Sequence, residues 1–338
     1  MPHALDTQNM EAIILDSPAQ FMEGWKAAAG LGSLGGPFTN IRLAGMGGSW
    51  MAAALVREAG LSQVPIHIHR TYGLPEKLRK EGTLVIASTF SGDTAEVISA
   101  YEAAREGNFA LVGIASKGEL PSLCGQHGTP FVRIPAVPLG MQPRCATGYT
   151  VGILTRLLVE HGLATEGAEE AIRSLGGALE ASMDTARQLG KNLVPALSQA
   201  TPVVYAACQY ETVARIWKIK FNENAKTPAF WNVFPELDHN ELVGWTDRRR
   251  PFHLVLLGDA SDDARILARF KKTAKLLREH EVYSSEIPIE GGSHVEKVFR
   301  TLLIGDWASY ELALELKHDP TPVDLVEEFK DRMKAGDP

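Results

Sequence analysis

Residues 40–50 read NIRLAGMGGSW, and their pattern indicates the class of fold. It opens with a short, largely apolar run, which leads directly into the glycine-rich residues 45–48. Residues 50–60 then have the apolar spacing of a helix. A strand that turns through glycines into a helix is typical of a parallel α/β sheet. Glycines at such a turn let backbone N–H groups approach an anion, and the start of the helix adds positive potential.

Two common phosphate-binding loops do not fit this turn. A dinucleotide-binding loop has the pattern GxGxxG, but Trp50 occupies the sixth position here. That loop also needs an acidic residue at the end of the next strand, where His69 and Arg70 stand. The P-loop needs Gly-Lys followed by Ser or Thr, and the sequence contains no such triplet. A different kind of anion-binding loop is therefore expected.

A second loop, TFSGDTAE at residues 89–96, also lies between a predicted strand and a predicted helix. The hydroxyls of Thr89, Ser91 and Thr94, with the first N–H groups of the helix, can satisfy phosphate oxygens. Two such loops at two strand ends of one sheet favour an anion site.

Helix capping is the alternative explanation for this second loop. Ser91 or Asp93 would cap the following helix, and Glu96 would complete a capping box. Taken alone, the sequence of the loop leaves both explanations open.

The alternation of strands and helices occurs twice along the chain, on either side of a helical stretch. We therefore predict an α/β protein with two subdomains, each a parallel sheet flanked by helices. The predicted parts are an N-terminal helix and turn (1–36), a first subdomain (37–150), connecting helices (151–197) and a second subdomain with a C-terminal helix (198–338).

Composition narrows the classes of function. The 338 residues are 45% apolar and 22% charged, which fits two globular domains. A net charge of −7 argues against nucleic acid as the main partner. The sequence has no apolar run long enough for a membrane span, and residues 1–15 lack the Lys or Arg of a signal peptide. The cysteines, Cys124, Cys145 and Cys208, form no disulfide framework, so a cytoplasmic location is expected.

A candidate general base lies in the segment FNENAK, residues 221–226. Glu223 falls seven residues after Ile216, on the apolar side of a predicted helix. Burial there would raise the pKa of this carboxylate toward a useful general-base range. Alternatively, Glu223 lies past the helix end and pairs with Lys220 or Lys226. Periodicity leaves both open.

Two further candidates are His239 and Lys330. His239 stands in the polar segment PELDHNE, residues 235–241, where it could be a solvated turn residue or a proton shuttle. Lys330 lies at the edge of the apolar stripe of a helix predicted at 323–333, with Thr321 as its cap and Pro322 at its first position. No second His stands at metal-ligand spacing from these residues, so no metal site is predicted.

The two hydroxyl loops together resemble the sugar isomerase (SIS) domain, in which the second loop reads S/T-x-S-G-x-T. The resemblance implies a phosphosugar ligand. Asp93 departs from the family, where Asn is common at this position. The phosphate-binding residues implied by the resemblance are Gly47, Gly48, Ser49, Thr89, Ser91 and Thr94.

The segments NENxK, PELxHNE and a C-terminal DPTPV followed by Lys resemble the bifunctional phosphoglucose/phosphomannose isomerases. The resemblance implies that Glu223 moves a proton between C1 and C2, and that His239 and Lys330 assist ring opening. It implies that Arg144, in a Pro-x-Arg type segment, stabilises enediol(ate) charge. It further implies a homodimer, with His239 reaching the partner's site, and no metal or redox cofactor.

The predicted activity is therefore the interconversion of glucose 6-phosphate, and mannose 6-phosphate, with fructose 6-phosphate. One alternative is an SIS isomerase for another phosphosugar. A glucosamine-phosphate synthase, whose isomerase lobe has the SIS fold, would also need a glutaminase domain with an N-terminal cysteine nucleophile. The first cysteine in this sequence is Cys124. The other alternative is a non-catalytic phosphosugar sensor, although such regulators usually carry a DNA-binding domain that this chain has no room for.

Overall fold

The structure is a computed structural model that describes residues 3–138, 140–247 and 251–335. The chain divides into two compact units, each built on one parallel sheet. The first-sheet unit comprises Ile13–Asp184 and Ile289–Thr301. The second-sheet unit comprises Met1–Ala12, Thr185–Pro288 and Leu302–Pro338. The predicted α/β class with two helix-flanked parallel sheets is confirmed.

The sheet of the first-sheet unit has five parallel strands in the order β2-β1-β3-β4-β5. Its strands are β1 (Asn40–Ala44), β2 (Ile66–His69), β3 (Thr83–Thr89), β4 (Ala110–Ala115) and β5 (Phe131–Arg133). Its helices are η1 (Ser17–Ala19), α2 (Gln20–Ala27), α3 (Gly48–Glu58), α4 (Ala95–Glu106), α5 (Glu119–His127), η2 (Pro143–Cys145) and α6 (Thr147–Glu160).

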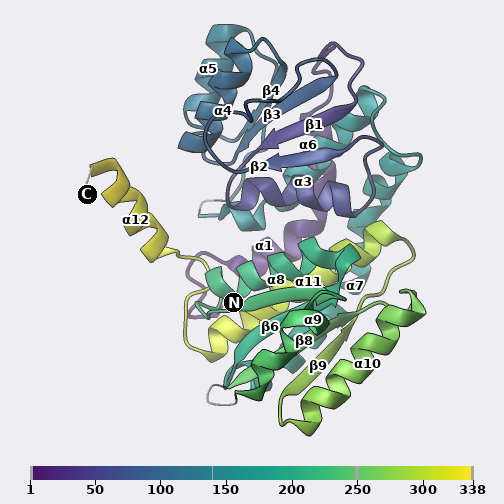
Figure 1. Cartoon of the computed structure of the whole chain (residues 1–338). Coiled ribbons are helices and arrows are strands. Elements are labelled where there is room, and N and C mark those ends of the chain that lie inside the picture. The colour runs from purple at the N-terminus through teal and green to yellow at the C-terminus, as the bar shows by residue number, and fades with distance from the viewer. Residues whose placement is uncertain (1–2, 139, 248–250, 336–338) are drawn as a thin grey trace. The chain divides into compact units, whose positions relative to one another are not determined.

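The order of these strands creates a switch point between β1 and β3. From β1 the chain passes through α3 to β2 on one side, whereas from β3 it passes through α4 and α5 to β4 and β5 on the other. Because such crossovers are right-handed, α3 covers one face of the sheet and α4 and α5 cover the other (Figure 1). The loops that follow β1 and β3 therefore leave adjacent strand ends in opposite directions. Parallel sheets bind ligands in the crevice that this creates.

The second sheet has four parallel strands in the order β7-β6-β8-β9. They are β6 (Thr201–Ala207), β7 (Phe230–Phe234), β8 (Phe252–Gly258) and β9 (Tyr283–Pro288). The helices of this unit are η3 (Cys208–Tyr210), α8 (Glu211–Glu223), α9 (Leu237–Asn240), η4 (Leu242–Thr246), α10 (Ala264–Glu279) and α12 (Asp324–Ala335). Helices with residues in both units are α1 (Met10–Asp16), α7 (Ala168–Leu197) and α11 (His294–Glu315).

Each unit has its own apolar core. In the first, Val85 and Ala87 of β3 pack with Tyr101 of α4 and Leu120 of α5. The second is rich in fully buried aromatic side chains, which include Tyr205, Tyr210, Trp217, Phe221, Phe234, Trp307 and Tyr310. Burying one large apolar side chain stabilises a fold by about 1.5–3 kcal/mol.

Two predicted helix boundaries are wrong. The N-terminal helix predicted within residues 1–36 is two helices, because η1 with Pro18 separates α1 from α2. The last helix begins at Asp324 rather than at Pro322. Thr321 does not cap it: its side chain is buried, and its N–H donates to Asp319 Oδ1 at 3.0 Å.

Two elements, helix α5 and strand β7, were not predicted from the sequence. Helix α5 carries Pro121 in its first turn, where the missing N–H is tolerated. Because proline usually breaks a helix, this residue argued against a helix in the sequence. Strand β7 is short and lies at the edge of its sheet between two prolines, Pro228 and Pro235. Its aromatic and β-branched residues were the signal that could have revealed it.

The contact between α2 and α6 yields a stability prediction. A Cβ atom on Gly152 of α6 would lie 2.0 Å from the carbonyl oxygen of Phe21 and 2.7 Å from the backbone nitrogen of Trp25. Because backbone rather than a flexible side chain fills this space, Gly152→Ala must separate the two helices. We expect a loss of about 1–3 kcal/mol in the free energy of unfolding, measured by urea denaturation followed by circular dichroism.

Gly177→Ala on α7 is the matched control. Gly177 is exposed and has nothing within 4 Å of an added Cβ, so the same substitution should stabilise its helix, by up to about 1 kcal/mol. Equal midpoints for the two variants would show that the α2–α6 contact does not constrain the fold.

Candidate functional site

The loops after β1 and β3 are joined by a hydrogen bond at the switch point. Ser49, the second residue of α3, accepts a hydrogen bond on its Oγ from the backbone N–H of Phe90 at 3.0 Å. Ser49 is buried, with 9% of its surface exposed. This bond fixes the hydroxyl oxygen while leaving its O–H able to donate to an anion.

The hydroxyls of the second loop form a tight group. Thr89 Oγ1 lies 2.7 Å from Thr94 Oγ1 and 3.4 Å from Ser91 Oγ. The backbone N–H of Gly92 donates to Thr89 Oγ1 at 3.3 Å, which closes the turn around them. We call Thr89, Ser91 and Thr94 the hydroxyl cluster. With Ser49 it presents several O–H donors beside two helix starts, an arrangement suited to an anion.

The capping alternative for this loop is wrong. The residue that caps α4 is Thr94, and it makes no side-chain capping bond. Asp93 interacts with a different helix. Its Oδ1 accepts a hydrogen bond from the backbone N–H of Glu119 at 2.8 Å, at the start of α5. A carboxylate is stabilised by the positive end of that helix. The charge at position 93, where the SIS family commonly has Asn, is thus engaged in capping α5.

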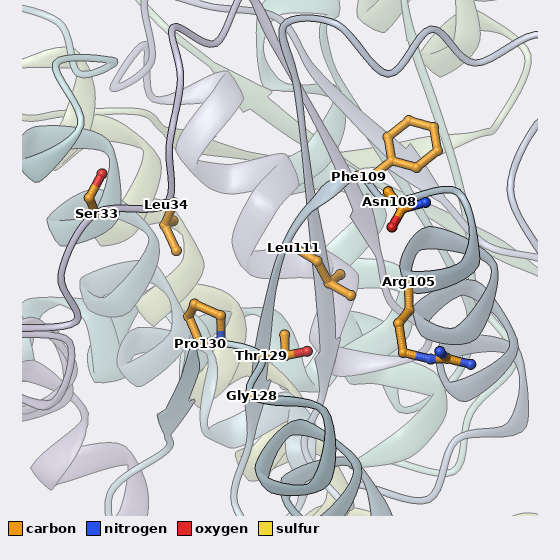
Figure 2. A pocket seen from close by; sticks show the side chains of 9 residues that line it. All are labelled: Ser33, Leu34, Arg105, Asn108, Phe109, Leu111, Gly128, Thr129 and Pro130. Atoms are coloured by element: carbon orange, nitrogen blue, oxygen red, sulfur yellow. The ribbon is translucent and has the colours of Figure 1, made fainter.

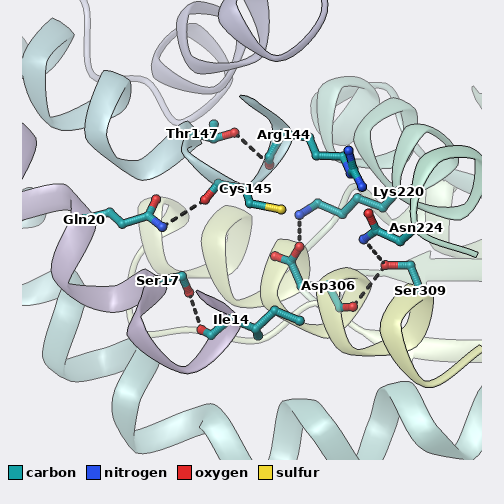
Figure 3. Close-up of polar contacts among 10 residues, drawn as sticks. All are labelled: Ile14, Ser17, Gln20, Arg144, Cys145, Thr147, Lys220, Asn224, Asp306 and Ser309. Carbon is teal, nitrogen blue, oxygen red and sulfur yellow. Dashed lines mark hydrogen bonds and ion pairs between the residues drawn. The ribbon is translucent and has the colours of Figure 1, made fainter. Parts of the chain in front are cut away.

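Glycines let a third segment close on the first loop. Gly47 caps α3 with φ +49° and ψ −126°, which a residue with a side chain rarely adopts. A Cβ on Gly48 would lie 2.7 Å from the carbonyl of Pro143 and 2.9 Å from the backbone nitrogen of Arg144. η2 therefore packs directly on the start of α3. Arg144 is 3% exposed, and its carbonyl accepts from Thr147 Oγ1 at 3.3 Å (Figure 3).

The structure thus gathers one group of predicted residues in the first-sheet unit. Two loops and η2 meet around the start of α3. The predicted residues in this group are Gly47, Gly48, Ser49, Thr89, Ser91, Thr94 and Arg144.

The second sheet has an equivalent switch point, between β6 and β8, with different chemistry. There Tyr210 donates its hydroxyl to Asp259 Oδ2 at 2.5 Å. Asp259 Oδ1 accepts from both the backbone N–H and the hydroxyl of Ser261, at 2.9 and 2.8 Å. A buried carboxylate occupies this crevice, so it would repel a phosphate.

Glu223 is the last residue of α8 and is half-buried. Lys220 does not pair with it, because the ammonium of Lys220 forms its ion pair with Asp306 (Figure 3). Lys226 Nζ donates to the backbone carbonyl of Glu223 at 2.7 Å. Asn224 is buried and donates from Nδ2 to Ser309 Oγ at 2.9 Å. These contacts hold the end of α8 against α11.

His239 lies on α9 and is exposed. The residues around it are anchored: Leu237 is buried, and Asp238 accepts from Arg269 Nη1 at 2.8 Å and from Thr273 Oγ1 at 2.9 Å. The turn is therefore fixed to α10 while the imidazole faces outward.

Glu223 and His239 of one chain lie at opposite edges of the second sheet. Helix α8 returns from the end of β6 to the beginning of β7, so Glu223 lies at the amino edge. His239 comes directly after β7, at the carboxyl edge. Five residues of strand span about 16 Å, too far for both side chains to touch one sugar carbon.

Lys330 is not packed against the rest of the chain. It lies on α12, is exposed, and pairs with Glu327 at 2.7 Å. Every residue of this helix from Asp324 to Met333 is exposed. The apolar stripe predicted for the helix is present, with Leu325 81% and Phe329 61% exposed.

Sequence reasoning missed the partners of Glu241. This carboxylate accepts hydrogen bonds from Tyr205 Oη and from Asn232 Nδ2. The signal was present: a tyrosine in the middle of an apolar strand, and an asparagine within the aromatic run of β7. A buried Tyr hydroxyl requires a partner.

A cavity of about 370 Å³ in the first-sheet unit lies elsewhere (Figure 2). It forms where β4 and β5 begin, whereas the hydroxyl cluster lies where strands end. Its one cation, Arg105, already pairs with Glu102 at 2.7 Å. This cavity is therefore separate from the hydroxyl cluster. Its lining residues are Ser33, Leu34, Arg105, Asn108, Phe109, Leu111, Gly128, Thr129 and Pro130.

The described part of the chain contains neither a metal-binding cluster nor a membrane-spanning helix. Within residues 3–138, 140–247 and 251–335, no three or more His, Cys, Asp or Glu side chains are placed to hold a metal ion. Over the same residues, none of the helices combines the length and the apolar character needed to cross a bilayer.

Comparison with solved structures supports the fold. The structure aligns with the C-terminal domain of glucosamine-fructose-6-phosphate aminotransferase from Francisella tularensis with a TM-score of 0.68. The alignment covers 95% of this chain and 99% of that one at 15% sequence identity. At this identity the likeness establishes the fold alone.

Sequence comparison is more specific. Residues 186–333 match the family described as the bacterial phospho-glucose isomerase C-terminal SIS domain. The chain is 32% identical over 303 residues to the bifunctional phosphoglucose/phosphomannose isomerase of Caldicellulosiruptor bescii, covering 86% of this chain and 88% of that protein. It is also 32% identical over 302 residues to the protein of the same name from Thermoplasma acidophilum, covering 88% and 91%. The chain therefore belongs to the bifunctional phosphoglucose/phosphomannose isomerase family.

Proposed function

We propose that this protein is an aldose–ketose isomerase that interconverts glucose 6-phosphate, and mannose 6-phosphate, with fructose 6-phosphate. The observation that carries the proposal is the Ser49–Phe90 hydrogen bond, which joins two hydroxyl-bearing loops at the switch point. Family membership supplies the chemistry, since relatives over most of the chain are named for both activities. Cys124, Cys145 and Cys208, all in the described part of the chain, form no disulfide, which fits a cytoplasmic enzyme.

In this proposal the phosphate binds to Ser49 and the hydroxyl cluster. Backbone N–H groups of Gly47 and Gly48 and the start of α3 add positive potential. Asp93 does not oppose binding, because its carboxylate is engaged at the start of α5. The anion site fixes one end of the sugar and so limits where its carbons can lie.

Glu223 is the proposed base. It takes the proton from C2 of the open-chain aldose, giving a cis-enediol(ate), and returns it to C1 to form the ketose. Arg144 is proposed to stabilise the negative charge that develops on oxygen, an effect worth several kcal/mol in comparable sites. Rotation about C2–C3 in the intermediate would let the same base serve the mannose epimer.

Ring opening is assigned to His239 and Lys330, as an acid/base pair acting on the ring oxygen and the C1 or C2 hydroxyl. We propose that the enzyme is a homodimer in which His239 of one subunit enters the site that holds Glu223 of the other. The separation of the two residues across the second sheet supports this arrangement, because a single chain cannot bring them to one sugar.

Glu223→Gln tests the base. The amide keeps the size of the side chain but cannot accept the proton, so kcat for fructose 6-phosphate should fall by about 10²–10⁴-fold with KM nearly unchanged. A coupled assay for glucose 6-phosphate, with mannose 6-phosphate as a parallel substrate, measures this. Glu211→Gln, at the exposed start of the same helix, should retain wild-type kcat. A wild type that binds phosphosugars without turnover would instead identify a sensor.

Thr94→Val tests the phosphate site. It preserves shape and removes one hydroxyl, so KM should rise about 10-fold or more while kcat changes little, as expected when a hydrogen bond to a charged group is lost. Asp93→Asn is the control, because an amide oxygen can still accept the bond from Glu119 N–H. If the two variants shift KM equally, the hydroxyl cluster does not bind the phosphate.

Mixed dimers test the shared site. Glu223→Gln and His239→Ala are each expected to lack most activity as homodimers. After subunits are exchanged at equal concentrations, half of the dimers are hybrids, and each hybrid has one site with both residues intact. About a quarter of wild-type activity should then return. No recovery, with hybrids demonstrated by native mass spectrometry, would contradict the shared site.

A further inference from the structure

We propose that Glu241, held by Tyr205 and Asn232, and Asp238, held by Arg269 and Thr273, are positioning residues that fix His239 in the geometry needed for ring opening. The inference rests on the proposed function and extends it to residues that touch no substrate.

The first support is the placement of these carboxylates on either side of His239. Asp238 precedes it and Glu241 follows two residues later, so the histidine lies between two carboxylates that other side chains hold in place. We call these two carboxylates the anchors of His239. Backbone bonds tighten the same turn: His239 N–H donates to the Glu236 carbonyl at 3.0 Å, and Glu241 N–H donates to the Leu237 carbonyl at 2.9 Å.

The anchor at Glu241 reaches into the core of the second-sheet unit. Tyr205 is fully buried in β6 and donates its hydroxyl to Glu241 Oε1. Asn232 of β7 donates to Glu241 Oε2, so both carboxylate oxygens are engaged. Trp245 Nε1 donates to Tyr205 Oη at 3.1 Å. The carboxylate therefore ties the segment that carries His239 to two adjacent strands.

The surroundings of Tyr205 keep its hydroxyl protonated, so that it always donates to Glu241. Burial, followed by the neighbouring carboxylate of Glu241, raises the pKa of Tyr205 far above its usual value. Tyr205 therefore remains a protonated donor throughout the working pH range. Hydrogen bonds in which the acceptor is ionised are roughly twice as strong as neutral ones.

The second carboxylate, Asp238, is held by side chains of α10. The Asp238 side chain is 9% exposed and accepts from Arg269 and Thr273 on successive turns of that helix. Neither anchor uses the imidazole of His239, which stays exposed. Four hydrogen bonds to two carboxylates thus restrain a residue that itself points away, which is the arrangement needed to deliver a side chain to a partner molecule.

The mechanical consequence is specific. Misplacing a reacting group by about 1 Å can lower a rate about 10²-fold. Loss of the Tyr205 hydroxyl should therefore reduce kcat through His239 alone and leave phosphate binding, and hence KM, unchanged.

Tyr205→Phe tests the inference by a double-mutant cycle with His239→Ala. We expect kcat for fructose 6-phosphate to fall about 10–100-fold in the wild-type background and less than about twofold in the His239→Ala background, since residues that act as a unit are not additive. Tyr283→Phe, the same substitution at an exposed tyrosine of β9, should leave kcat unchanged. An equal fall in both backgrounds would show a general structural role and overturn the proposal.

A second measurement does not depend on turnover. Backbone amides of residues 237–246 should exchange with deuterium at least about tenfold faster in Tyr205→Phe, and in the milder Glu241→Gln, than in Tyr283→Phe. Unchanged exchange in both variants overturns the proposal. If the wild type has no isomerase activity, or His239→Ala has full kcat, the function proposed for His239 fails, and the exchange result alone decides whether the two anchors hold this segment.

Discussion

The handedness of parallel crossovers is the constraint on which the candidate site depends. Because the chain leaves β1 and β3 in opposite directions, their carboxyl ends open side by side without a helix between them. The Ser49–Phe90 bond then fixes the two loops relative to each other. Close packing of Pro143 on Gly48 brings Arg144 to the same helix start. The proposed anion site thus depends on topology first and on particular side chains second.

The second sheet also has a switch point, between β6 and β8, but the side chains there differ from those of the first sheet. Its switch point carries Tyr210, Asp259 and Ser261, whose mutual hydrogen bonds satisfy a buried carboxylate. These hydrogen bonds join the loops, and the Asp259 carboxylate would repel a phosphate. The second-sheet unit is instead free to present residues at the two edges of its sheet, Glu223 at one and His239 at the other. The same architecture thus has a proposed binding role in one unit and a proposed proton-transfer role in the other.

Much of the fold could be predicted because local signals and tertiary structure agree. Apolar runs followed by glycine or hydroxyl residues correctly predicted β1 and β3 and the helices after them. The failures occurred where a distant contact decided the structure. Asp93 had the sequence of a cap for its own helix, yet it caps α5, whose start lies 26 residues away. Thr321 resembled a cap, yet it is buried while Asp319 holds its N–H. Neither partner is visible in local sequence.

The candidate site, like the fold, could be predicted where local sequence carried a signal and could not be predicted where distant parts of the chain decided the geometry. Periodicity drew attention to Glu223, and its place in a polar segment drew attention to His239. Family resemblance supplied their roles, but only topology revealed that one chain separates them by the length of β7. This separation has a physical advantage in a shared site. A histidine restrained by core-bound carboxylates can enter a neighbouring molecule with little conformational entropy left to lose. The polar groups around His239 therefore support the proposed dimer as much as the stability of the monomer, because a surface loop with no role in a shared site would not need two hydrogen-bonded carboxylates to restrain it.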